Sequence, residues 1–246
     1  MPPMINVHQL AKGLCVSDGI FSVIKSVFPT FVAGAKDLQR SIITPTEFFK
    51  DMKLRNYWCA QASLIGLVMA VALSLLSFPS LKGIGIELSK DFVAVMVVLN
   101  CMLLILYGAC FWLGARFMFG KGSLFSTINS FFYISICLVF MKIAEMPALG
   151  SRMTALAHSC ELGEFGANVT AAISASSVSR TSNFLIGVFY LAFTVCSVKL
   201  QRGVNDFGIV RGVVSAIFGM LFLSLAVIYI QEPAVYAVVC GYLGEK

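Results

Sequence analysis

Five long apolar segments alternate with shorter polar stretches along the chain. They cover residues 57–78, 92–119, 124–149, 183–199 and 210–230. A helix needs about 20 mainly apolar residues to cross a membrane, so this pattern predicts an all-α fold, a polytopic membrane bundle of five transmembrane helices. Only the residues GKGS separate the second and third segments, and a short polar turn separates the fourth and fifth. Both pairs are therefore expected to form antiparallel hairpins.

The same pattern divides the chain into three regions. Residues 1–56 are expected to form an N-terminal region with interfacial amphipathic helices, and residues 57–230 the five-helix transmembrane domain. Residues 231–246 are expected to form a short non-cytoplasmic C-terminal tail. The stretch 150–182 between the hairpins is rich in Ser, Ala and Gly, which predicts an irregular loop.

Composition strengthens the membrane interpretation. The 246 residues are 59% hydrophobic and 12% charged, with a mean hydropathy of +0.89, whereas soluble domains are about 45–50% apolar and about 25% charged. Little of the chain is left for a separate soluble domain. The formal net charge is +6, which we attribute to cytoplasmic loops rather than to nucleic-acid binding, because Lys and Arg collect on the cytoplasmic side of membrane proteins.

The distribution of basic residues near the span ends predicts the orientation. Nine lie on the N-terminal side of the membrane: Arg40, Lys50, Lys53, Arg55, Arg116, Lys121, Lys199, Arg202 and Arg211. Six lie on the other side: Lys82, Lys90, Lys142, Arg152, Arg180 and Lys246. The excess favours a cytoplasmic N-terminus and a non-cytoplasmic C-terminus.

The N-terminal region has the pattern of two amphipathic helices. The stretch TPTE, residues 44–47, has the form of a capping box with proline at the first helical position, and Phe48, Phe49 and Met52 then alternate with charged residues such as Lys50. Upstream, an apolar helical stripe contains Ile20, Ile24, Val27, Phe28, Phe31, Ala35 and Leu38. The helices can lie on the membrane surface, with nearby lysines and Arg40 toward anionic head groups, or pack against the bundle; the pattern leaves both open.

Small residues predict where the spanning helices approach each other closely. The first span has one at every fourth position, and the fifth repeats the spacing in two pairs. The candidate helix-packing residues are Ala62, Gly66, Ala70, Ser74, Gly212, Ala216, Ser215 and Gly219.

Polar residues inside the spans are the candidates for function. The third span carries Asn129 and Tyr133, the second carries Asn100, and Lys142 and Glu145 are spaced to pair along one helix face. Hydrogen bonds between helices explain the uncharged groups, and an interfacial position with a snorkelling lysine explains the pair. The alternative is a polar route through the bundle.

The eight cysteines form no C-x-x-C motif, and most are expected to act as small apolar residues. Cys160 and Cys240 fall on the same non-cytoplasmic side, where a disulfide is an open alternative to two free thiols. The sequence contains no H-E-x-x-H, G-x-S-x-G or Walker A motif. We therefore expect neither an enzyme nor a cofactor, and no metal site.

Two stretches resemble Yip1-domain proteins, especially bacterial members. They are ITPTEFFKDM before the first span and ARFMFGKGSLFSTINSFFY across the first hairpin. The matching features are Pro45, Phe48, Phe49, Gly120, Lys121, Gly122, Ser123 and Tyr133. The resemblance implies five passes, a cytoplasmic N-terminus and, for a bacterial member, the inner membrane. Eukaryotic members act in ER–Golgi traffic and contact Rab GTPases, but the D-L-Y-G-P stretch of those members is missing here, so Rab binding is not carried over.

Three functions remain after these exclusions. The first is a non-enzymatic membrane organiser, scaffold or trafficking-type factor that binds membrane lipids and a protein partner or a second copy of itself. The others are a transporter or channel component and an accessory subunit of a larger membrane complex. The candidate cytoplasmic interaction residues of the first hypothesis are Pro45, Phe48, Phe49, Lys50, Gly120, Lys121, Gly122 and Ser123.

Overall fold

A computed structural model describes residues 16–87, 89–162 and 177–244 of the chain. Within these ranges the fold is helical and contains no strand. Five helices there are long and apolar enough to cross a membrane. The structure therefore confirms the all-α fold and the five predicted spans.

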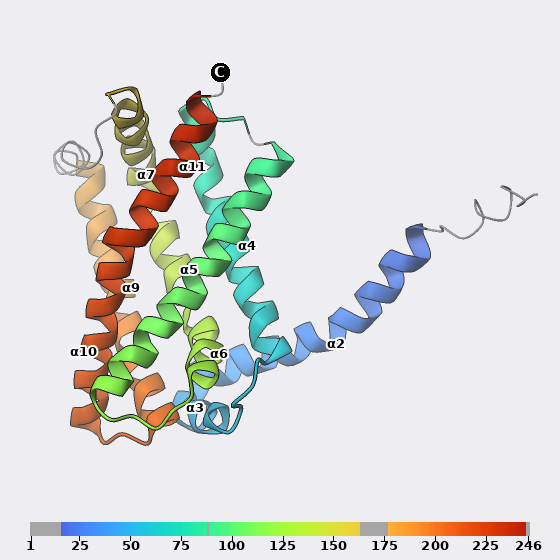
Figure 1. Cartoon of the computed structure of the whole chain (residues 1–246), viewed down its shortest axis with the longest axis vertical. Helices are drawn as coiled ribbons and strands as arrows, with labels where there is room; N and C mark the ends of the chain where they lie inside the picture. The colour runs from blue at the N-terminus through green and yellow to red at the C-terminus, as the bar shows by residue number, and fades with distance from the viewer. Residues whose placement is uncertain (1–15, 88, 163–176, 245–246) are drawn as a thin grey trace, which may run out of the picture.

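The spanning helices stand side by side in a bundle (Figure 1). The first is α4, Ala60–Gly83, and the second is α5, Lys90–Phe117. The third is divided into α6, Leu124–Ile134, and α7, Ile136–Leu162, and the fourth is α9, Ser177–Asn205. The fifth consists of α10, Ile209–Ala226, a π-helical turn η1, Val227–Gln231, and α11, Glu232–Gly244.

Two regions are more helical than the sequence pattern predicts. The expected loop at 150–182 is helix up to Leu162 and again from Ser177, and its middle part, 163–176, lies outside the described residues. The expected C-terminal tail at 231–246 is helix as far as Gly244 and continues the fifth span. The π-helical turn ends at Gln231, two residues before Pro233. Pro233 has no N–H to donate, and the helix continues past it as α11.

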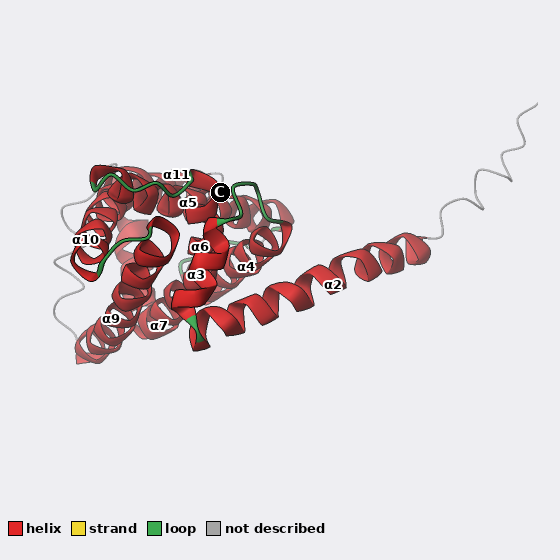
Figure 2. Ribbon diagram, turned by 90° about the horizontal axis from the view of Figure 1, so that it is seen from below, coloured by secondary structure: helices red, strands yellow, loops and turns green. Residues whose placement is uncertain are grey.

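Two further helices precede the bundle. The short helix α3, Pro45–Lys53, lies under one end of it, and the longer α2, Val16–Ile43, leaves the same end sideways (Figure 1). Figure 2, seen from that end, shows α2 extending well beyond the bundle. We call this end, which also holds the turns at 118–123 and 206–208, the α3 end.

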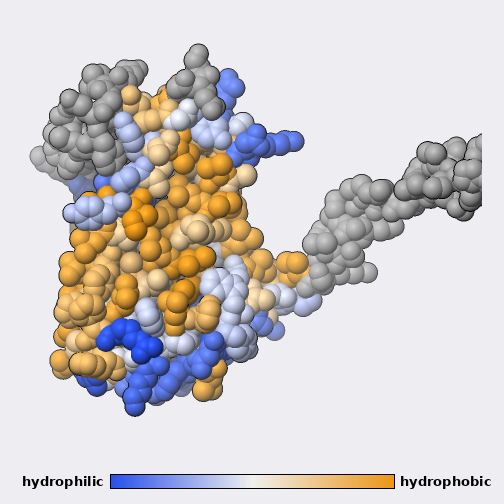
Figure 3. Space-filling model, in the orientation of Figure 1, coloured by the Kyte–Doolittle hydropathy of each residue, from blue (hydrophilic) through white to orange (hydrophobic). Residues whose placement is uncertain are grey.

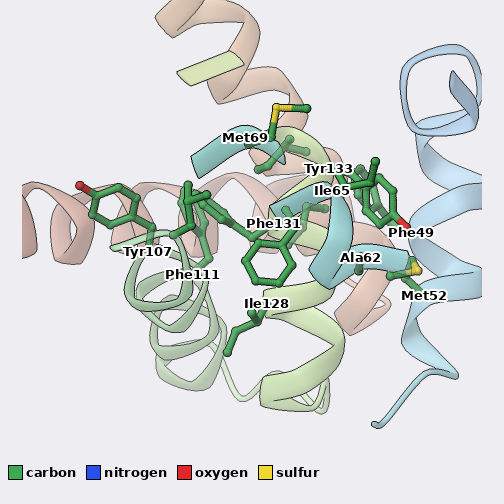
Figure 4. Packing of buried hydrophobic residues seen from close by; sticks show 14 of the residues in the cluster. Phe49, Met52, Ala62, Ile65, Met69, Tyr107, Phe111, Ile128, Phe131 and Tyr133 are labelled. Atoms are coloured by element: carbon green, nitrogen blue, oxygen red, sulfur yellow. The ribbon is translucent and has the colours of Figure 1, made fainter. Parts of the chain in front are cut away.

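The surface agrees with a membrane position. Figure 3 shows hydrophobic residues over the middle of the bundle and hydrophilic residues toward both of its ends. Inside, aromatic side chains from several spans form the core, among them Phe111, Phe131 and Phe193, which are at most 1% exposed (Figure 4 shows part of this cluster).

The small residues lie at close helix contacts. The side chains of Ala62, Ala70 and Ser74 are fully buried. A Cβ atom on Gly66 would lie 2.7 Å from the ring of Phe132, and one on Gly114 of α5 would lie 2.5 Å from the backbone nitrogen of Gly219. Helices α5 and α10 therefore touch backbone to backbone. Ser215 and Ala216 are buried in the same helix, α10, whereas Gly212 faces the side chain of Arg202.

Candidate functional site

Helix α3 is packed firmly against the bundle. Phe48, Phe49 and Met52 are at most 1% exposed. The ring of Phe48 meets that of Tyr133 edge to face, with centroids 4.9 Å apart, and a Cβ atom on Gly203 of α9 would collide with the Cβ of Phe49. The two phenylalanines that were candidate interaction residues therefore serve the internal packing, while Lys50 beside them is exposed.

The predicted capping box is not formed. Pro45 does begin α3, but the side chain of Thr44 caps no N–H of that helix. Its hydroxyl instead donates to the carbonyl of Arg40 at 3.4 Å, because α2 runs into α3 almost without interruption. The backbone carbonyl of Thr44 still accepts the first bond of the new helix, from Phe48 N–H at 3.1 Å.

A buried chain of amides holds the first hairpin turn in place. Gly122 N–H donates to Asn205 Oδ1 at 2.9 Å, Asn205 Nδ2 donates to Gln201 Oε1 at 3.0 Å, and Gln201 Nε2 donates to the Phe111 carbonyl at 2.7 Å. A Cβ atom on Gly120 or Gly122 would lie 2.5 or 2.7 Å from Asn205 Oδ1. The two glycines thus give Asn205 access to the backbone of the turn.

The other two members of the turn have different positions. Ser123 caps α6 by accepting a hydrogen bond from Ser126 N–H at 3.0 Å. Lys121 is exposed. Of the four GKGS residues, Lys121 is therefore the side chain that a partner or lipid at the α3 end can reach.

Ion pairs fasten α2 and α3 to their surroundings. Arg55 Nη1 lies 3.3 Å from Asp37 Oδ2 of α2 and 3.2 Å from Gln61 Oε1 of α4. Burial lowers the pKa of the Arg55 guanidinium, but its contacts with Cys59 and Asp37 outweigh burial, and the pKa is raised above its usual value. A Cβ atom on Gly34 would lie 3.2 Å from the Gln61 carbonyl. Helix α2 thus crosses the first turn of α4 at close range.

Two more ion pairs join elements at this end. Arg40 of α2 lies 2.8 Å from Asp51 of α3, and both side chains are about half exposed. Lys53 at the end of α3 pairs with Asp206 in the turn between α9 and α10. These exposed pairs contribute little stability, about 0–1 kcal/mol each, but they use up carboxylates that would otherwise balance neighbouring cations.

The intramembrane polar candidates join helices to each other. Asn129 donates to the Tyr57 carbonyl at 2.8 Å and accepts from Cys59 N–H at 3.4 Å, so it fixes the entry to α4. Asn100 donates to Ser74 Oγ at 2.8 Å and so links α5 to α4. Among the hydrogen bonds of the described residues, none connects the two asparagines.

The charged candidates lie apart from these amides. Lys142 Nζ is 3.1 Å from Glu145 Oε2, and both belong to α7, which continues well past the point where the span was expected to end. The hydroxyl of Tyr133 is buried and has no hydrogen-bond partner in the described part of the chain.

The opposite end of the bundle carries a covalent link. Cys160 of α7 and Cys240 of α11 form a disulfide with Cα atoms 5.5 Å apart. The structure therefore decides between the two alternatives that the sequence left open. Among the described residues, five other cysteines are free, and each is buried or half-buried: Cys59, Cys101, Cys110, Cys137 and Cys196.

These features define the class of the protein: a multi-pass helical membrane protein whose polar groups mostly connect its own elements. The described residues contain no group of three or more His, Cys, Asp or Glu side chains that could hold a metal ion. No protein-family model, curated protein or solved structure significantly matches the chain.

Two site residues were missed from the sequence, Gln201 and Asn205. The sequence pattern places them in the polar turn that follows the fourth span, where amide side chains are common and indicate no particular role. Their spacing of four residues, which puts both on one face of a helix, was the available signal.

Proposed function

We propose that the chain is a non-enzymatic membrane organiser, a scaffold or trafficking-type factor, in which the bundle anchors an N-terminal arm that engages a partner protein. One observation carries the proposal, namely the contrast between α3 and α2. The apolar side chains of α3 are buried in the bundle, whereas α2 projects from it with four apolar side chains exposed at residues 27–32. Phe28 is 60% exposed and Phe31 41% exposed.

The exposed residues of α2 form one face. Val27 and Phe31, like Phe28 and Val32, are four positions apart, and Phe28 and Phe31 are three apart, so the four residues share a side of the helix. Such a helix is suited to lie in the membrane interface with this side toward the acyl chains. The arm then presents its opposite side to the aqueous phase, where Arg40 is exposed and a protein partner can dock.

The disulfide supports the membrane orientation that this proposal requires. Disulfides persist in oxidising compartments and are rare in the cytosol, so the end with Cys160 and Cys240 is assigned to the non-cytoplasmic side and the α3 end to the cytoplasm. We further propose a Yip1-like protein of a bacterial inner membrane, on the basis of the sequence motifs. A membrane-impermeant maleimide tests the orientation: Lys82→Cys should react from outside intact cells and Lys121→Cys only after lysis.

Crosslinking tests the function directly. A photo-crosslinking residue at Lys50 or Lys121, both exposed, should capture one stoichiometric partner that mass spectrometry identifies. Deleting residues 1–40 removes most of α2 but leaves α3 in the chain, so capture should be lost while the bundle stays folded. Phe28→Ser with Phe31→Ser is the matched point variant, and Phe117→Ser, another exposed phenylalanine on α5, is its control. Capture that survives the deletion would show that the arm is not the docking site.

A transporter or channel component is the second candidate, because two spans depart from regular α-helix. The third is interrupted at Ser135 and the fifth contains the π-helical turn, at which Gln231 accepts a hydrogen bond from Tyr107; such irregularities are frequent at functional sites. Glu145→Gln should then change ion flux in reconstituted vesicles. Flux equal to that of empty vesicles for every ion tested would count against this function.

An accessory subunit differs from a scaffold in the permanence of its complex. The partner identified by crosslinking is then tested by gel filtration of the complex without crosslinker. Co-elution would favour an accessory subunit, and dissociation on dilution would favour a scaffold.

A further inference from the structure

The α3 end carries cations that its carboxylates do not balance. Its acidic residues are Asp37, Glu47, Asp51 and Asp206, and the structure uses three of them in ion pairs with Arg55, Arg40 and Lys53. Seven cations at this end pair with no carboxylate in the described ranges: Lys36, Lys50, Arg116, Lys121, Lys199, Arg202 and Arg211. The ion pairs therefore leave a strongly positive surface.

Two of these cations flank the turn between α9 and α10, Arg202 on α9 and Arg211 on α10. The aliphatic part of Arg202 lies against Gly212, because a Cβ atom there would collide with the Arg202 Cγ. Arg211, next to this glycine, donates to the Met118 carbonyl at 2.5 Å, and its guanidinium lies 4.9 Å from the ring centroid of Phe207. Arg202, in contrast, makes no hydrogen bond to the described residues, and its Nε is buried without a partner.

We infer that Arg202 and Arg211 bind the phosphate of an anionic phospholipid head group. A guanidinium presents its donors in a planar fork that matches phosphate oxygens, and Arg202 is held by packing with its donors unused. Both arginines lie within a few residues of the ends of their spans, which is the depth of lipid head groups. The inference rests on the proposed function only in placing this end at a membrane surface rich in anionic lipid.

The apolar neighbours favour a lipid over a soluble anion. Ile209 is 64% exposed and Val210 75% exposed, and both directly precede Arg211. A free phosphate has no use for two exposed aliphatic side chains beside its site. In a phospholipid, the acyl chains continue from the phosphate into the bilayer and can cover these two aliphatic side chains.

The experiment uses the full chain in a neutral detergent, titrated with phosphatidylglycerol while the melting temperature is recorded. Anything that binds only the folded state raises the melting temperature with concentration, so the titration yields an apparent affinity. Arg202→Gln is the first variant, because Arg202 donates no hydrogen bond in the described structure and the fold should tolerate its loss. The matched control is Lys90→Gln, at the start of α5 on the opposite side.

We expect Arg202→Gln to weaken the affinity for phosphatidylglycerol about fivefold, and the double variant with Arg211→Gln about 30-fold, from the usual contribution of each cation at an anionic surface. Arg202→Lys should recover only part of the loss, since it restores the charge but not the fork. Lys90→Gln should behave like the wild type.

Three results would overturn the inference: unchanged affinity in both arginine variants, an equal shift with neutral phosphatidylcholine, or an equal shift with inorganic phosphate, which would indicate a free-anion site. The crosslinked partner at Lys50 is measured separately in cells. Loss of lipid binding and loss of partner capture can therefore be told apart.

Discussion

Replacing Asn205 by alanine removes the centre of the amide chain that joins the first hairpin turn to α9. The Gly122 N–H would lose its acceptor and Gln201 Oε1 its donor. Each buried polar group left without a partner costs about 1–3 kcal/mol. Because the turn lies near the aqueous end of the bundle, water can replace part of the loss. We expect a decrease of about 2–4 kcal/mol in the free energy of unfolding.

A chain of this size loses about 2–4 °C in melting temperature per kcal/mol, by the calibration for soluble proteins. The melting temperature of the purified Asn205→Ala variant in detergent should therefore fall by about 4–16 °C. Asn56→Ala is the control, because Asn56 is exposed and makes no hydrogen bond in the described chain. Equal melting temperatures for Asn205→Ala and Asn56→Ala would refute the role of the amide chain.

Three further substitutions test packing and the covalent link. Gly66→Ala should destabilise the bundle by about 1–3 kcal/mol, because the new Cβ meets the ring of Phe132, whereas Gly187→Ala, which meets nothing within 4 Å, should be neutral or slightly stabilising; thermal melting compares them. Phe49→Ala should cost about 3–5 kcal/mol and expose the chain around α3 to protease, and an unchanged digestion pattern would contradict its docking. Cys240→Ser removes a link across a sequence separation of 80 and should cost up to about 4–5 kcal/mol; reducing agent should lower the melting temperature of the wild type but not that of the variant.

The five spans were predictable because the membrane imposes a length and a composition that any helix crossing it must meet. The end of the fifth span was not, because Glu232 and Pro233 are typical of a helix terminus outside the bilayer. In the structure the helix continues through these two residues as α11, after the π-helical turn at Val227–Gln231. The sequence preferences of single residues do not predict such a turn.

The candidate site, too, was predictable from the sequence only in part. That Lys50 and Lys121 are exposed follows from their charge, and it agrees with the structure. The sequence left open whether Phe48 and Phe49 face lipid or the bundle, because an amphipathic helix has the same pattern whether its apolar side meets lipid or protein. The tertiary partner Gly203 decides that question, and it lies about 150 residues away in the sequence.

The disulfide between α7 and α11 has a consequence for how the molecule is made and moves. Cys240 is among the last residues of the fifth span, so the link can close only after the final helix has been synthesised. Once closed, it fastens the third span to the fifth at the end of the bundle opposite α3 and restrains their separation there. Any widening of the bundle must then hinge about that end, and its amplitude is largest at the opposite end, where α3 is wedged against α9.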